Sequence, residues 1–153
     1  MNASRRTLLA ALGIALLAVF APLHAMAEGE KADVTVHVVL ASKQKGENDP
    51  RLERFRKALG DFAYKNYKLL AMKKASVEMG KSETVELAGG KTLTLNFRSI
   101  DKDGRARMKL TIPGVVETTV AVRPGGDVVL GGPAMPHGDG VLFVPVTLNK
   151  VAK

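Results

Sequence analysis

The chain of 153 residues is 46% hydrophobic and 25% charged, a composition that suits one globular domain with a core of its own. It holds no cysteine, which excludes disulfide bonds, a cysteine nucleophile and the acylated cysteine of a lipoprotein. The formal net charge of +8 favours anionic partners.

The first 27 residues have the pattern of a secretory signal peptide. Arg5 and Arg6 precede an apolar run from Leu8 to Leu23, and an Ala-Met-Ala triplet at 25–27 follows it. A basic start, an apolar middle and a small-residue cleavage site are typical of such signals, and the run is short for a membrane span. An uncleaved anchor and export by the twin-arginine route are the alternatives. We predict that the mature protein starts near Glu28, is periplasmic or secreted, and is not an integral membrane protein.

Residues 28–153 are predicted to form a single β-rich domain. Apolar side chains alternate with others from 33 to 40, which predicts the first strand. Asp49 and Pro50 then suit the start of a helix, and Gly60 suits its end. Apolar residues at helical spacing predict one buried face; they are Leu52, Phe55, Leu59 and Phe62.

After Tyr64 the apolar residues recur with a period of two, which is typical of strands. The predicted strands are 67–79 (with a bend near Lys73 and Lys74), 84–87, 92–100, 105–112, 117–123, 127–130 and 141–148. The segment from Gly131 to Gly140 is predicted to be a long glycine- and proline-rich loop. We therefore expect an α+β fold that is mainly antiparallel β, a sandwich or partly open barrel of about eight strands with one amphipathic helix after the first strand.

Basic residues concentrate in one segment of the chain. From Lys43 to Lys74 there are ten basic and four acidic residues, a net charge of +6, whereas the rest of 28–153 is neutral. One basic region gives the domain a directional field that attracts anions, although a merely solvated face is the alternative. Five cations on positions expected to face solvent are predicted to contact an anionic partner: Arg51, Arg54, Lys57, Lys65 and Lys68.

No catalytic residue, metal site or cofactor is predicted. The run from Asp101 to Gly104 resembles the start of a calcium-binding loop but lacks the later ligands, so we interpret it as a hairpin turn. His137 and Asp139 have no evident third ligand. The sequence also lacks the Gly-x-Ser-x-Gly pattern of a serine nucleophile.

Tyr64 and Tyr67 alternate with Lys65 and Lys68, a pattern that could stack nucleic-acid bases and hold phosphates. The same pattern suits a half-buried strand with a soluble face. Because the signal segment directs the chain out of the cytoplasm, we do not expect nucleic acid as a partner.

The segment 118–132 combines paired threonines, a glycine-containing turn, an aliphatic strand and a Gly-Gly pair, and a Val-Pro-Val run follows at 144–146. This hairpin resembles a motif of the secretin family of outer-membrane secretion channels. The chain is far too short to form such a channel itself. Its layout as a whole also resembles small exported proteins of Gram-negative bacteria, a resemblance that implies no established activity.

These features predict a non-enzymatic binding or assembly module at the cell surface or in the periplasm, an accessory to an envelope or secretion complex with an envelope protein as its partner. It would dock through the basic helix region, a sheet edge or the segment 131–140. The alternative is a module that binds anionic lipid or polysaccharide through its basic face, an interaction that salt weakens steeply. An enzyme is the third hypothesis, and the sequence offers no matched acid–base or metal set for it.

Overall fold

The computed structural model describes residues 29–60 and 64–153. The predicted signal segment and Phe62 therefore lie outside the described residues. Within these ranges, every helical segment is too short or too polar to cross a membrane.

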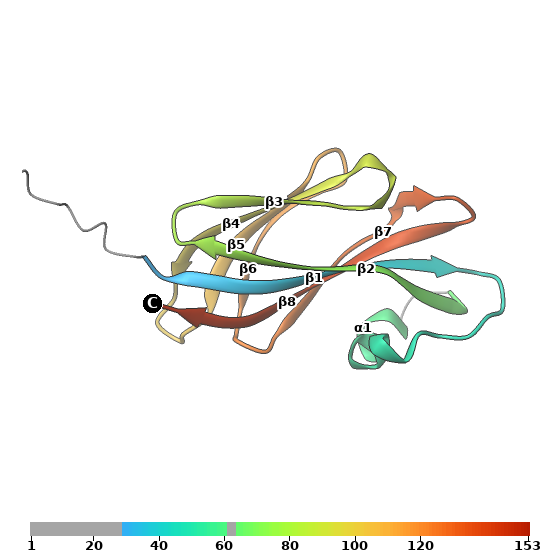
Figure 1. The fold of residues 1–153 in the computed structure, drawn as a ribbon, viewed down its shortest axis with the longest axis horizontal. Helices are drawn as coiled ribbons and strands as arrows, with labels where there is room; N and C mark the ends of the chain where they lie inside the picture. The colour runs from blue at the N-terminus through green and yellow to red at the C-terminus, as the bar shows by residue number, and fades with distance from the viewer. Residues whose placement is uncertain (1–28, 61–63) are drawn as a thin grey trace, which may run out of the picture.

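The described residues form two antiparallel sheets of four strands each (Figure 1). Sheet A has the strand order β2-β1-β8-β7, and sheet B has the order β3-β4-β5-β6. The strands are β1 (Lys31–Ser42), β2 (Asn66–Glu78), β3 (Ser82–Glu86), β4 (Thr92–Ile100), β5 (Ala106–Ile112), β6 (Val116–Val122), β7 (Asp127–His137) and β8 (Gly140–Ala152). The helical segments are η1 (Pro50–Phe55), α1 (Arg56–Gly60) and η2 (Ala88–Gly90).

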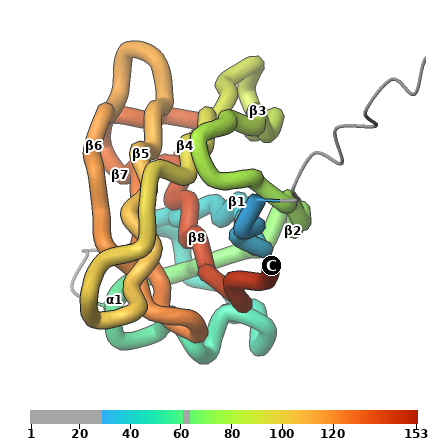
Figure 2. The backbone as a smooth tube through the Cα atoms, turned by 90° about the vertical axis from the view of Figure 1, so that its left-hand side faces the viewer, coloured from blue at the N-terminus to red at the C-terminus, as the bar shows by residue number. Residues whose placement is uncertain are grey.

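The strand order is that of an up-and-down ring opened at two places. Within each sheet, neighbours in space are mostly neighbours in sequence, and β1 closes the ring by pairing with both β2 and β8. In Figure 2, β3, β4, β5 and β6 follow one another from right to left along their layer. The ladder is interrupted at two seams, between β2 and β3 and between β6 and β7. The predicted fold is confirmed: it is mainly antiparallel β, with eight strands in two sheets and one short helix, as in a sandwich or open barrel, and no closed barrel forms among the described residues.

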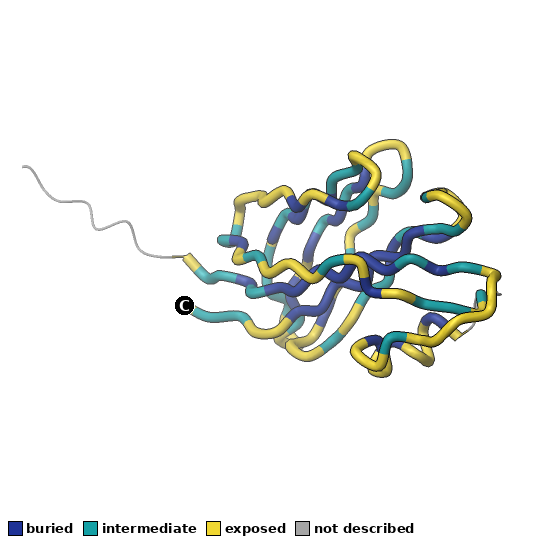
Figure 3. The backbone as a smooth tube through the Cα atoms, turned by 45° about the vertical axis from the view of Figure 1, so that its right-hand side comes forward, coloured by how far each residue is buried: buried dark blue, intermediate teal, exposed yellow. Residues whose placement is uncertain are grey.

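The main core lies between the two sheets. Alternate residues of β4 and β5 point into it, as the period of two predicts, and Leu93, Leu95, Phe97, Met108 and Leu110 are at most 2% exposed. Figure 3 shows buried and exposed residues following one another along the same strands. An aliphatic core of this kind holds the sheets together without disulfides.

A second, smaller core lies on the outer face of sheet A, under η1 and α1. Leu52, Phe55 and Leu59 are at most 4% exposed, which confirms the predicted helical face. They pack over Val39 and Ala41 of β1, whose neighbours Val36 and Val38 face the main core instead. Strand β1 is therefore buried on both faces.

The predicted helix is divided into a 3-10 turn and a short α-helix. Asp49 caps its start, and Pro50 occupies the first helical position. Six residues of 3-10 helix precede five of α-helix. Such tight turns are frequent at helix starts, and the periodicity of apolar residues does not distinguish them from α-helix over so short a segment.

The predicted loop from Gly131 to Gly140 is wrong. Strand β7 continues to His137, and β8 begins at Gly140. The pairing register shifts between Gly132 and Pro136, so the intervening residues bulge out of the ladder, and Met135 is fully buried in the main core. Gly131 and Gly132 adopt φ values of +90° and +107°, which only glycine accommodates without strain, and this permits the kink.

Candidate functional site

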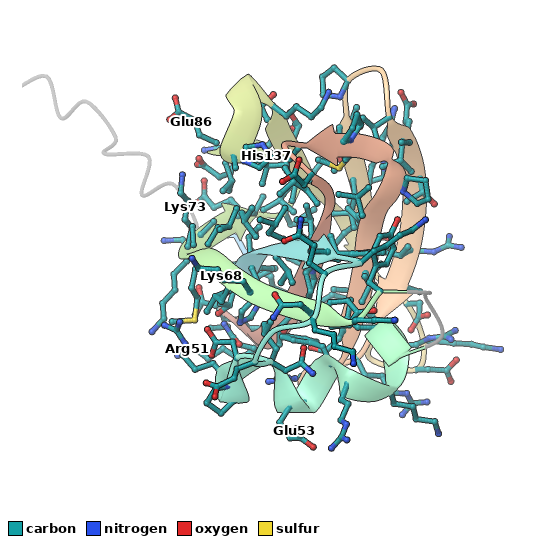
Figure 4. The ribbon with its side chains drawn as sticks, turned by 90° about the vertical axis from the view of Figure 1, so that its right-hand side faces the viewer. Arg51, Glu53, Lys68, Lys73, Glu86 and His137 are labelled. Atoms are coloured by element: carbon teal, nitrogen blue, oxygen red, sulfur yellow. The ribbon has the colours of Figure 1, made fainter. Side chains whose placement is uncertain are left out.

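The five cations predicted to contact a partner are all exposed, but they occupy three different settings. Arg51 and Arg54 lie on η1, Lys57 lies on α1, and Lys65 and Lys68 lie just before and on β2. Arg51 and Lys68 line one shallow groove at the start of β2. Figure 4 shows Arg51, Lys68 and Lys73 along one side of the molecule.

Arg51 is held by the carboxylate of Asp49. Its Nε donates to Oδ1 at 2.9 Å and its Nη2 donates to Oδ2 at 2.6 Å. The backbone N–H of Arg51 also donates to Oδ1, at 3.0 Å, which is the cap of η1. These hydrogen bonds lower the pKa of Asp49 to about 2. The charge of Arg51 is thus matched by an adjacent carboxylate, although 67% of its side chain is exposed.

Arg54 joins η1 to strand β7. Its Nη2 lies 2.8 Å from Oδ1 of Asp127, which also accepts a hydrogen bond from Thr147 Oγ1 at 2.6 Å. The Arg54 guanidinium lies 5.3 Å from the centroid of the Phe55 ring. Arg54 therefore helps to hold the helical segment on sheet A.

Ion pairing separates the arginines of the basic segment from its lysines. Arg56 pairs with Glu53 at 3.2 Å, so each of the three arginines between 43 and 74 has a carboxylate partner. No lysine of the segment forms an ion pair with a described residue; they are Lys43, Lys45, Lys57, Lys65, Lys68, Lys73 and Lys74. The charge available to a partner comes from these lysines.

Most of these lysines lie on or beside β2. The backbone N–H of Lys65 donates to the carbonyl of Ser42 at 2.9 Å, which places Lys65 next to the loop that carries Lys43 and Lys45. β2 is an edge strand of sheet A, so its cations border a free margin of the sheet. We call Lys65, Lys68, Lys73 and Lys74 the lysine edge. The last two were not among the predicted contacts, because the sequence does not reveal which strand lies at an edge.

Two large apolar side chains are exposed on the same strand. Leu70 is 38% exposed and Met72 is 57% exposed, and they are the exposed large hydrophobic residues of the described chain. Leu70 is the extra residue of a β-bulge, since Val38 pairs with Ala71 and Val39 with Leu69. The pairing register is regular at Lys73 and Lys74, where the sequence predicts a bend, and it shifts at Leu70 instead.

A groove of about 430 Å³ separates β2 from β3 and is lined by residues 73–76 and 83–86. Lys73 spans it, because its Nζ donates to the carbonyl of Glu86 at 2.7 Å. A second groove, of about 380 Å³, lies beside η1 and α1. Tyr67 contributes to its wall and donates its hydroxyl hydrogen to the carbonyl of Leu59 at 2.6 Å.

His37 is a buried polar residue under the helical segment. It is 7% exposed, and its ring meets that of Phe55 edge-on, with the centroids 4.8 Å apart. Its Nδ1 has no hydrogen-bond partner among the described residues. Burial lowers the pKa of His37; the Pro145 carbonyl opposes this, the positive charge of Arg54 adds to it, and Asp127 opposes it.

The remaining candidate residues, in the turn after β4 and at the end of β7, make local structural contacts. The Asp101 carboxylate accepts hydrogen bonds from the backbone N–H groups of Asp103 and Arg105 at 2.9 and 3.0 Å, which confirms a turn. His137 lies against Gly89, where an added Cβ would come within 3.2 Å of its Nδ1. No group of three or more potential metal ligands occurs among the described residues.

Comparison of the chain with protein-family models, with curated proteins and with solved structures finds no match in any of the three.

Proposed function

We propose that the protein is an exported, non-enzymatic binding or assembly module that docks an acidic partner protein of the cell envelope through the lysine edge. The observation that carries this proposal is the separation of paired arginines from unpaired lysines. Each arginine of the basic segment is already neutralised by a carboxylate, whereas Lys65, Lys68 and Lys74 are exposed and have no acidic partner among the described residues.

A protein partner is favoured over a lipid surface or a polysaccharide by the apolar side chains between the lysines. Leu70 and Met72 are exposed on the strand that carries Lys68, Lys73 and Lys74. Protein interfaces combine a central apolar contact with a charged rim, and the rim raises the association rate. A purely electrostatic docking surface does not require the apolar pair.

The test is a photo-crosslinking amino acid placed at Lys68, with the same replacement at Lys102 as the matched control. Lys102 is exposed and lies in the turn between β4 and β5. In cells that export the protein, we expect a protein adduct from position 68 and none from position 102. N-terminal sequencing of the exported chain should begin near Glu28.

A triple charge reversal then tests the role of the lysines. With the crosslinking amino acid kept at position 68, Lys65→Glu, Lys73→Glu and Lys74→Glu together should weaken the adduct at least tenfold, the lower range of electrostatic steering. The control reversal has the same change in charge and uses three other exposed cations, Lys102, Arg107 and Lys153. Equal loss in both reversals, or no protein adduct at position 68, contradicts the proposal. Binding to anionic vesicles or a sulfated polysaccharide without a protein adduct would support the alternative.

A further inference from the structure

The free margin of β2 is covered only at its beginning. The backbone N–H of Tyr67 donates to Asn48 Oδ1 at 2.9 Å, and the N–H of Asp49 donates to the carbonyl of Tyr67 at 3.1 Å. The backbone of Leu69 also contributes to the lowered pKa of the Asp49 carboxylate. Beyond Leu69 this loop has turned away into η1, and from Leu70 onward β2 pairs with β1 alone.

The pairing register shows which backbone groups face the free margin. The N–H and carbonyl groups of Tyr67 point outward, away from β1. Its partner Ala41 therefore directs its own N–H and carbonyl groups toward β8. The even-numbered residues of β1 are then the ones that form hydrogen bonds to β2. After the bulge, these even-numbered residues pair with Ala71, Lys73 and Ala75, whose N–H and carbonyl groups therefore point toward β1. The N–H and carbonyl groups of the alternate residues therefore point outward; they are Met72, Lys74 and Ser76.

Strand β3, across the seam, also has alternate residues whose backbone groups point outward. Phe97 N–H donates to the carbonyl of Lys81, which directs the odd-numbered residues of β3 toward β4. The carbonyl of Glu86 accordingly faces β2, and Lys73 reaches it. Two open strand margins thus border the groove of about 430 Å³, and one lysine side chain bridges them.

We propose that the margin of β2 from Leu70 to Ser76 receives an extended, acidic segment of a partner protein as an added strand. This inference rests on the proposed function and names how the partner binds. Unpaired N–H and carbonyl groups of an edge strand are the template for strand addition, and pockets or charges for alternate side chains give it specificity.

The side chains that flank this margin specify an alternating guest strand. Lys68 and Lys73 lie on the face of β2 that is turned toward sheet B, since their partners Leu40 and Val36 pack on the main core. Met72 and Lys74 lie on the opposite face, where their partners are His37 and Thr35. The aliphatic stem of Lys74 adds apolar surface there while its ammonium group stays in water. A guest with acidic residues on one face and apolar residues on the other matches both faces.

A second copy of this chain matches the margin poorly. Pairing two β2 margins would bring together the positive charges of two lysine edges, and like charges on adjacent strands destabilise pairing. Lysines on an edge strand are also a recognised device against edge-to-edge association. An acidic strand instead gains ion pairs, and a carboxylate can replace the Glu86 carbonyl as the partner of Lys73.

The test uses a capped seven-residue peptide of alternating valine and glutamate, labelled for fluorescence anisotropy with the purified protein. Two further peptides carry N-methyl groups on the odd or on the even amides. N-methylation removes the donors of one edge of the peptide, so we expect one series to lose at least tenfold in affinity and the other to stay within about threefold of the parent. A valine–lysine peptide should not bind.

The protein itself supplies a matched pair of variants. Met72→Pro removes an outward N–H and keeps the ladder to β1, whereas Met72→Ala removes the side chain and keeps the N–H. We expect the proline variant to lose at least tenfold in affinity and the alanine variant to lose far less. If the proline variant fails to fold, the N-methyl series still decides the question with the unaltered protein.

Three results would overturn the inference. Equal binding of both N-methylated series would mean that the charges alone hold the peptide, which leaves the proposed function intact. No binding of the alternating acidic peptide would remove strand addition, while the crosslink at position 68 tests the proposed function separately. A dimer of the free protein in sedimentation, dissolved by Met72→Pro, would identify a second copy as the occupant.

Discussion

Replacing Phe55 with alanine tests how the helical segment is held on sheet A. Phe55 is 1% exposed and belongs to the small outer core, which is separate from the core between the sheets. Phe-to-Ala changes at buried sites cost about 3–5 kcal/mol. The edge-on contact with His37 adds about 0.5–1.5 kcal/mol to such a burial. The short helical segment over the outer core can move to fill part of the cavity, which keeps the cost within this range. We therefore expect the free energy of unfolding to fall by about 4 kcal/mol.

The assay is a urea titration of the variant beside Lys57→Ala, which changes an exposed residue of α1 and should cost under about 0.5 kcal/mol. Hydrogen exchange should locate the damage: amides of η1 and α1 lose protection, and those of β4 and β5 keep it. The pKa of His37 should rise toward its ordinary 6.5 as water reaches the ring. A cost below about 1 kcal/mol, or equal loss of protection in both cores, would refute the reasoning.

Two further predictions concern buried residues whose roles emerged from the structure. Because burial lowers the pKa of His37 below 6.5, the unfolded chain binds the proton more readily, so this contribution to stability is present above about pH 6.5 and is lost as the pH falls from there toward the folded-state pKa. His37→Phe should flatten that part of the stability–pH curve, and an unchanged slope would show that His37 is not its source. Met135→Ala should cost about 2–5 kcal/mol in the same titration, since the side chain is fully buried. Replacement of the exposed Pro133, two positions away, is the control. An equally small loss of stability at both positions would indicate a surface loop instead of a strand.

Strands could be predicted from the sequence wherever one face of the strand is exposed to solvent and the other is buried. In β5, Ala106, Met108, Leu110 and Ile112 alternate with polar residues, and the structure buries those four. β7 does not follow this rule, because glycines, prolines and a bulge replace the alternation after Leu130. Composition there indicates a loop, whereas the burial of Met135 and pairing with β8 decide in favour of a strand.

The candidate site was only partly accessible from the sequence. Exposure of Arg51 and Arg54 follows from the helical period, but their carboxylate partners do not. Asp127 lies 73 positions from Arg54, and only the packing of η1 against β7 brings them together. Edge position is likewise a property of the whole sheet, so Lys73 and Lys74 could not be distinguished from lysines on an inner strand.

The strand order also dictates when each sheet can form. Sheet B is a local meander from β3 to β6, whereas sheet A requires β1 to meet β8, which pairs Lys31 with Ala152. Contacts so distant in sequence form slowly, because the closure of a long loop must precede them. We expect sheet B to assemble first, with its apolar face uncovered until β8 arrives between β1 and β7. The thirteen residues of β8 therefore control how long this chain remains vulnerable to aggregation during synthesis or export.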